Sequence, residues 1–93
     1  MRSEQGEVPR VSAFSGITIR MYFDDHPPPH FHARAAEHDA KIRIDTLEAI
    51  DTNFGRRELR LVLTWARMHA EELETNWRRA REGATLQPIE PLP

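Results

Sequence analysis

The chain has 93 residues, of which 39% are hydrophobic and 30% are charged, so it has enough apolar side chains for one small domain but not for two. It contains no cysteine, which excludes a disulfide scaffold and a zinc site made of thiolates. A formal net charge of −2 excludes a globally cationic nucleic-acid binder. The sequence has neither a run of about 18 apolar residues nor the apolar core of a signal peptide, so it predicts a cytoplasmic protein without a membrane partner.

The chain begins with a polar segment, residues 1–13, which we predict to be a flexible arm with an edge segment around Pro9. A single α+β domain over residues 14–87 and an extended, proline-rich tail over 88–93 are predicted to follow. We expect the tail to lie back against the domain. No segment of the chain repeats another, so an array of repeated units is excluded.

Three runs of residues, 17–23, 30–35 and 40–45, alternate between apolar and polar side chains, which is typical of half-buried strands. Residues 47–50 are predicted as a short fourth strand. Pairing apolar with apolar residues predicts the registers, so that paired positions sum to 54 in the first hairpin and to 75 in the second. Phe31 then faces Phe23 on one neighbouring strand and Ile44 on the other.

The segment 56–82 contains no proline or glycine, and its apolar residues follow alternating steps of four and three, which predicts a helix with one apolar seam. The seam consists of Leu59, Leu63, Ala66, Ala70, Leu73, Trp77 and Ala80. A helix of this length would extend about 40 Å, whereas a strand extends about 20 Å, so the helix either projects beyond the sheet or breaks near 69–71. The predicted fold is α+β: a three- or four-stranded antiparallel meander with one long helix or two consecutive C-terminal helices packed on one face.

A second apolar stripe on the predicted helix consists of Leu61, Trp65 and Met68. On a straight helix this stripe points to a different side from the seam, so the sheet that covers the seam cannot cover both. Apolar stripes left on a surface often mark interfaces, so these residues are predicted to contact a protein partner or a second copy in a homodimer.

Several motifs along the chain occur together and in order. They are Ser15-Gly16-Ile17, Met21-Tyr22-Phe23-Asp24-Asp25-His26-Pro27-Pro28-Pro29-His30-Phe31-His32, the helical set Trp65, His69, Glu72-Leu73 and Asn76-Trp77, and the ending Pro88-Ile89-Glu90-Pro91-Leu92. With these motifs the chain resembles, from about Val8 onward, a family of small bacterial proteins: the domain of unknown function 4160.

The chain departs from that family at two turns. Ala35-Ala36 stands where the family often has an aromatic residue and a glycine, and Phe54-Gly55 stands where a proline often precedes the helix. The resemblance implies a bacterial origin and a place beside toxin–antitoxin or small regulatory modules.

Under the predicted registers, the polar residues of the strands share the sheet face opposite the helix. This face is predicted to present Arg20, Tyr22, His30, His32, Arg34, Lys41, Arg43 and Asp45. It therefore forms a locally basic platform on a protein whose overall charge is negative.

Three histidines, His26, His30 and His32, lie within seven residues around the triproline, and three interpretations of them stay open. The favoured interpretation is structural: the rings cap the hairpin and bind loop carbonyls, and no cofactor is expected. In the second, the platform binds a ligand or nucleic acid through its cations and Tyr22.

In the third interpretation, the histidines and Asp24 bind a divalent metal such as zinc, or His30 and His32 are catalytic, with Asp45 orienting His30 as a general base. The sequence favours a non-enzymatic interaction or regulatory module, the antitoxin-like partner in a two-gene system. The alternatives are a toxin-like ribonuclease, which is metal-dependent or histidine-based, and a nucleic-acid-binding platform.

Overall fold

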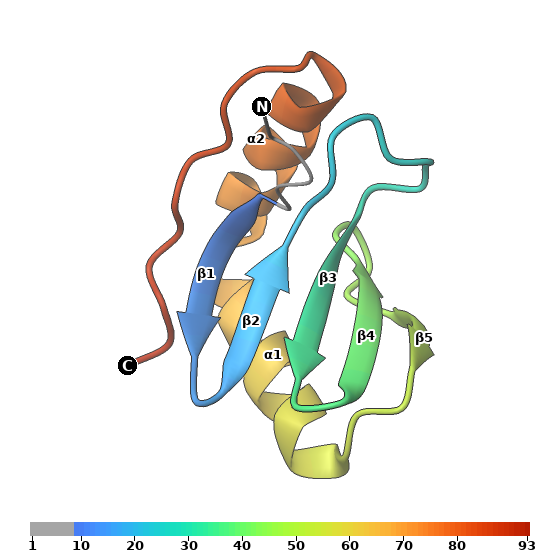
Figure 1. Ribbon diagram of the computed structural model, residues 1–93, viewed down its shortest axis with the longest axis vertical. Helices are drawn as coiled ribbons and strands as arrows, with labels where there is room; N and C mark the ends of the chain where they lie inside the picture. The colour runs from blue at the N-terminus through green and yellow to red at the C-terminus, as the bar shows by residue number, and fades with distance from the viewer. Residues whose placement is uncertain (1–8) are drawn as a thin grey trace.

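The computed structural model describes residues 9–93, and its elements form an α+β fold with a five-stranded antiparallel sheet in the order β1-β2-β3-β4-β5 (Figure 1). The elements are β1 (Arg10–Phe14), β2 (Ile17–Arg20), β3 (His30–Ala35), β4 (His38–Arg43), β5 (Ala49–Thr52), α1 (Arg56–Met68) and α2 (Ala70–Arg81). The predicted meander and C-terminal helices are confirmed, but the sheet has five strands rather than three or four. Within residues 9–93, no helix combines the length and the apolar character needed to cross a membrane.

The additional strand, β1, comes from the segment predicted to be a flexible arm. Residues 10–13 of that segment pair with β2, whereas residues 1–8 lie outside the described residues. The burial pattern of β1 does not alternate, because Val11 and Ser12 are both buried where the register shifts between β1 and β2. This irregularity is the reason that a period-two pattern does not identify the strand.

Strands β2, β3 and β4 bury the face that alternation predicts, but both predicted registers are wrong by two residues. Phe23, which is predicted to face Phe31 in the core, lies beyond the end of β2 and is 47% exposed. Ile19 pairs with Ala33 and Phe31 pairs with Ile42, so the paired positions sum to 52 and 73. A shift of two keeps every side chain on its face, since strand side chains alternate with period two. In the second hairpin the shift follows from the turn, because only two residues, Ala36 and Glu37, connect β3 to β4.

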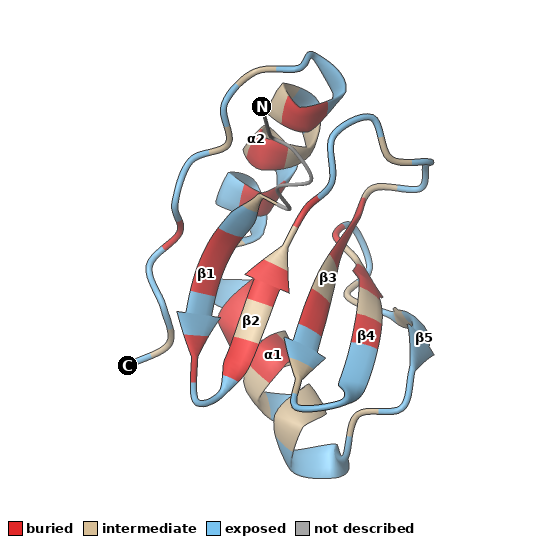
Figure 2. Ribbon diagram, viewed as in Figure 1, coloured by how far each residue is buried: buried red, intermediate tan, exposed pale blue. Residues whose placement is uncertain are grey.

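The helices cover one face of the sheet, and the core lies between these two layers (Figure 2). Val62, Trp65 and Ala66 of α1 and Leu73 and Ala80 of α2 are fully buried or nearly so. The two helices are separated by His69, whose backbone has φ −127° and ψ 29°, so of the two alternatives, a projecting helix and a break near 69–71, the structure has the break.

The predicted interface stripe on the helix is wrong for Trp65. Its side chain has 0% exposure, and its indole N–H donates a hydrogen bond to the carbonyl oxygen of Glu90 at 2.8 Å. Leu61 is half-buried and Met68 is 56% exposed, so Met68 alone of the three is a large exposed side chain. The straight helix assumed in the prediction does not exist, and the C-terminal tail contacts Trp65.

The tail beyond α2 lies back along the molecule beside β1, the arrangement expected for it (Figure 1). The backbone N–H of Ile89 donates to the carbonyl oxygen of Val11 at 2.8 Å, and the Asn76 side chain exchanges two hydrogen bonds with the Gln87 backbone. Because the bond from Ile89 uses a carbonyl at the outer edge of β1, the tail protects part of an edge that other strands would otherwise pair with.

Candidate functional site

The loop between β2 and β3, residues 21–29, is attached to the C-terminal end of α2. The backbone N–H of Asp24 donates to the carbonyl oxygen of Ala80 at 3.3 Å, and the Arg81 guanidinium donates to the carbonyl oxygen of Asp25 at 3.2 Å. Asp24 has φ +56°, a left-handed conformation that aspartate adopts more readily than most residues. These features fix the position of Asp25 relative to β3.

The carboxylate of Asp25 meets two histidines of β3, and we name this group the Asp25–His30–His32 cluster. Its oxygen Oδ2 lies 2.9 Å from Nε2 of His30 and 3.2 Å from Nε2 of His32. Residues two apart in a strand share a face, which is why both rings reach the same oxygen. The His30 side chain has 4% exposure, whereas Asp25 has 21% and His32 has 27%, so the cluster is open to solvent on one side only.

The ring of His30 is oriented by contacts on its other side. Its Nδ1 donates a hydrogen bond to the carbonyl oxygen of Pro28 at 2.6 Å, and the ring packs against Trp77 of α2 with 5.3 Å between centroids. Because a carbonyl only accepts, Nδ1 carries a proton. The other ring nitrogen, Nε2, is therefore the atom that faces Asp25.

The environment of the cluster shifts two pKa values. Burial opposes ionisation of Asp25, but the hydrogen bonds from His32 and from the His26 backbone N–H, together with the charge of the histidines, lower the pKa of Asp25 below its usual value. Burial lowers the pKa of His32, and its hydrogen bond to Asp25 offsets this effect only in part. Near neutral pH the cluster therefore holds a carboxylate beside a neutral His32.

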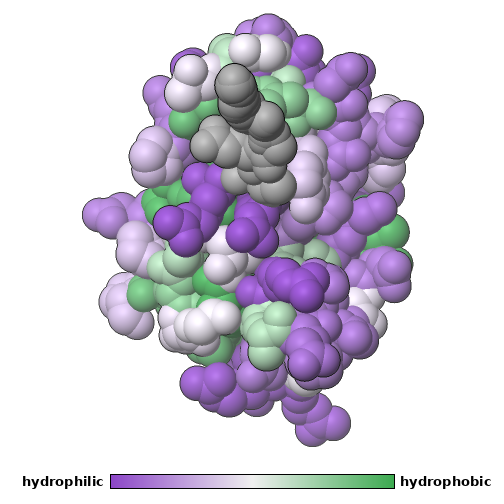
Figure 3. Space-filling model, in the orientation of Figure 1, coloured by the Kyte–Doolittle hydropathy of each residue, from purple (hydrophilic) through white to green (hydrophobic). Residues whose placement is uncertain are grey.

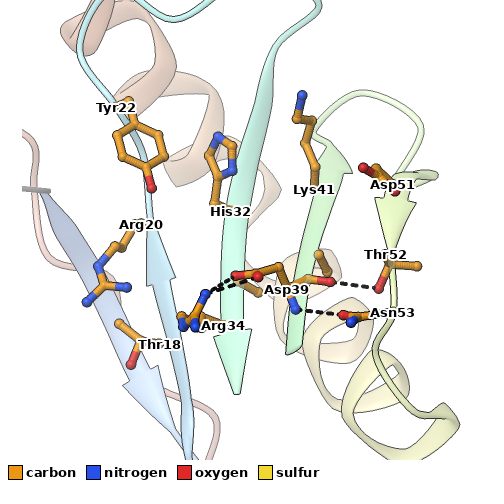
Figure 4. Close-up of a pocket in the computed structure, with 12 residues that line it drawn as sticks. Thr18, Arg20, Tyr22, His32, Arg34, Asp39, Lys41, Asp51, Thr52 and Asn53 are labelled. Carbon is orange, nitrogen blue, oxygen red and sulfur yellow. Dashed lines mark hydrogen bonds and ion pairs between the residues drawn. The ribbon is translucent and has the colours of Figure 1, made fainter. Parts of the chain in front are cut away.

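The open face of the sheet contains a hollow of about 540 Å³, which His32 of the cluster helps to line (Figure 4). Its lining side chains come from β2, β3, β4 and the region of β5. They are Thr18, Arg20, Tyr22, His32, Ala33, Arg34, Asp39, Ala40, Lys41, Asp51, Thr52 and Asn53. Figure 3 shows that this side of the molecule is mainly hydrophilic.

The cations of the hollow differ in how they are paired. The Arg34 guanidinium donates to both carboxylate oxygens of Asp39, at 2.8 and 3.0 Å, so its charge is largely compensated. Among the ion pairs within residues 9–93, none includes Arg20 or Lys41. The ring of Tyr22 is 39% exposed and stands edge-on to His32 at 4.6 Å. The hollow therefore offers two cations and one aromatic ring to a ligand.

The comparison with family models gives one match, to the description "Domain of unknown function (DUF4160)", over residues 16–78. This chain belongs to the DUF4160 family. Neither a curated protein nor a solved structure matches it. The matched segment includes the whole Asp25–His30–His32 cluster and the residues that line the hollow. The family description states no activity, so the function of this DUF4160 protein is argued from the site.

The structure brings together five of the predicted platform residues on the open face of the DUF4160 sheet: Arg20, Tyr22, His32, Arg34 and Lys41. His30 does not belong to the exposed platform, because α2 and the triproline loop bury it. Arg43 does not line the hollow either. Its guanidinium is paired with Asp45 at 2.7 and 2.9 Å.

The predicted acidic partners of the histidines are also corrected. Asp45 binds Arg43 rather than His30, so it does not orient His30 as a general base. In the set of converging ligand atoms, Asp25 takes the place predicted for Asp24, and the exposed His26 ring is not included. Strand β2 ends at Arg20, so alternation along it does not determine which of Asp24 and Asp25 faces the histidines. The motif did contain the correct carboxylate, Asp25, directly after Asp24.

Proposed function

We propose that this DUF4160 protein is a small RNA-binding regulatory module and that single-stranded RNA binds in the hollow on the open face of its sheet. The observation that carries the proposal is the combination of the exposed Tyr22 ring with Arg20 and Lys41, which are not compensated by ion pairs within residues 9–93. Sheet-based RNA-binding modules use aromatic rings to stack on bases and cations to hold phosphates.

Polar groups near these three residues can bind the ribose and the base edge of a nucleotide. Asp51 and Asn53 line the far side of the hollow, where their side chains can bind the ribose 2′-hydroxyl or amino groups of a base. The volume of about 540 Å³ is appropriate for one or two nucleotides rather than a duplex. Two cations imply few phosphate contacts, so we expect modest affinity with a shallow salt dependence, a log–log slope of about −1.4.

The regulatory part of the proposal follows the family resemblance. We assign a module that binds RNA without cleaving it to the antitoxin-like role in a two-gene system. A toxin-like ribonuclease would use the same hollow but would shorten the RNA. Cleavage is therefore measured alongside binding, and the absence of shortened products supports the regulatory assignment.

The experiment is fluorescence polarisation with a labelled ten-nucleotide RNA of mixed sequence at two salt concentrations. We expect Tyr22→Ala to weaken binding about tenfold through lost stacking. Arg20→Ala and Lys41→Ala should each weaken binding severalfold and make the salt dependence shallower. Arg60→Ala is the matched control, because Arg60 is an exposed arginine on α1, away from the hollow.

Competition with a mononucleotide shows whether the ligand is a free nucleotide or an RNA strand, since both carry a base and a phosphate. If it displaces the RNA at a similar concentration, the ligand is a nucleotide rather than an RNA strand. The proposal is wrong if no RNA binds at low salt, or if Arg60→Ala weakens binding as much as Arg20→Ala does.

A further inference from the structure

We propose that the Asp25–His30–His32 cluster is a binding site for one divalent transition-metal ion of the zinc type. The ligands are Nε2 of His30, Nε2 of His32 and the carboxylate of Asp25. This inference goes beyond the RNA-binding proposal, since His32 is the one of the three ligands that also lines the hollow.

The first argument is the convergence of the three ligand atoms. One ligand atom from each residue lies within 4.8 Å of the other two, and Asp25 Oδ2 lies 2.9 and 3.2 Å from the imidazole nitrogens. Zinc binds nitrogen and oxygen ligands at about 2.0–2.2 Å in a tetrahedral arrangement, which places adjacent ligand atoms about 3.3–3.6 Å apart. The two distances to Asp25 lie about 0.1–0.4 Å below that range, so an ion would require only a small outward shift of the carboxylate.

The orientation of His30 brings a ring nitrogen to the carboxylate. Its Nδ1 donates to the Pro28 carbonyl, so Nε2 faces Asp25 Oδ2 at 2.9 Å. This contact is favourable when a positive charge lies on Nε2, supplied by a proton or by a metal ion, and a metal ion would bind the lone pair of Nε2 directly.

Contacts with neighbouring groups hold the ligand residues in place. Metal-binding histidines usually donate their second ring nitrogen to a carbonyl or carboxylate, as His30 does to Pro28. Trp77 restricts the His30 ring, and Arg81 holds the Asp25 backbone. For His32, Nδ1 makes no hydrogen bond to the residues that the structure describes, so it can carry the proton when Nε2 binds the metal.

The ligand set also indicates which ions fit and where the site is open. Two imidazoles and one carboxylate, without thiolates, suit zinc, cobalt, nickel and ferrous iron. Three protein ligands leave at least one position for water or another ligand, the pattern of catalytic rather than structural zinc sites. Because His32 also lines the hollow, the cluster adjoins the proposed RNA-binding surface.

The test uses the full chain without a histidine tag, after treatment with a chelator that is then removed. Zinc is titrated by calorimetry, and cobalt is followed by its visible absorption spectrum. We expect one ion per chain and a melting temperature that rises with zinc concentration. Asp25→Asn and His32→Ala should each weaken zinc binding at least tenfold, and the visible spectrum of bound cobalt should lose intensity.

The matched controls are His26→Ala and His38→Ala, which remove exposed histidines of the same chain outside the cluster. Both should bind zinc as the wild type does. Circular dichroism establishes that each variant is folded. If Asp25→Asn fails to fold, His32→Ala decides alone, since its side chain is more exposed.

The metal site is disproved if neither zinc nor cobalt binds. It is also disproved if binding persists in both Asp25→Asn and His32→Ala, or if His26→Ala abolishes it. The two proposals remain distinguishable: Tyr22→Ala should weaken RNA binding and leave zinc binding intact. Asp25→Asn should weaken zinc binding at least tenfold, while RNA binding in the presence of chelator is kept.

Discussion

The Asp25–His30–His32 cluster and the hollow lie on the same sheet, yet they are built in opposite ways. In the cluster, the side chains bind one another or the backbone, and α2 covers the innermost ring. In the hollow, Arg20 and Lys41 extend from the sheet without ion pairs to residues 9–93 (Figure 4). A ligand of the cluster meets groups that are already ordered, whereas a ligand of the hollow must order long side chains at an entropic cost.

This contrast predicts that the cluster contributes to the stability of the fold and that the hollow contributes to ligand binding. Changes in the cluster should affect the free energy of unfolding, because they leave buried polar groups without partners. Changes in the hollow should affect ligand binding and hardly affect folding, because the side chains are solvated.

The largest effect on stability is expected for His30→Ala. The substitution removes a buried ring from Trp77 and leaves the Pro28 carbonyl without its donor, so we expect the free energy of unfolding to fall by about 2–4 kcal/mol. Urea denaturation followed by tryptophan fluorescence measures this change. His38→Ala, at an exposed position, should stay within about 0.5 kcal/mol of the wild type. A loss of stability equal in both variants would contradict the contrast.

A smaller effect is expected on acidification of the metal-free protein. The pKa of His32 is lowered by burial, so below pH about 6.5 the unfolded chain binds more protons at this position than the folded chain, and stability falls. Asp25, whose pKa is also lowered, contributes stability above its ordinary pKa of 3.8 and loses it below that value.

Melting temperatures between pH 7.5 and pH 5 measure the His32 contribution in the presence of chelator. The decrease should be smaller in His32→Asn, which cannot titrate. A decrease of the same size in both proteins would assign the effect to other groups.

Sequence reasoning predicted the faces of the sheet but not the details that place the site. Alternation identifies the buried face of β2, β3 and β4, since the side-chain period of a strand does not depend on its partners. The register depends on turn geometry, and Ala36 at φ +54° allows a connection shorter than the hydrophobic pattern required. The family-like motif contained Asp25, but only the left-handed turn at Asp24 determines which of the two aspartates meets the histidines.

The turn at Ala36 gives a prediction of intermediate size. A left-handed conformation costs a residue with a Cβ about 1–2 kcal/mol, and glycine avoids that cost but loses more entropy on folding. Ala36→Gly should therefore stabilise the protein by about 0.5–1 kcal/mol. Chemical denaturation measures the gain, and Ala13→Gly, in strand β1 without a positive φ, is the control that should lose stability. A loss in Ala36→Gly would show that this turn does not constrain the register.

The smallest effect on folding is expected in the hollow itself. Lys41→Ala and Arg20→Ala should change the free energy of unfolding by less than about 0.5 kcal/mol, because neither charge is paired within the described residues. The same denaturation assay measures both variants. A loss near that of His30→Ala would mean that the hollow is part of the stabilising framework.

The most direct test of the open face as the functional surface is an amide chemical-shift titration of the labelled protein with the ten-nucleotide RNA. The account predicts that the shifts concentrate on Arg20, Tyr22, His32 and Lys41, which share the open face, and that the amides of α1 stay unchanged. Shifts confined to α1 and α2, or no shifts at saturating RNA, would contradict it.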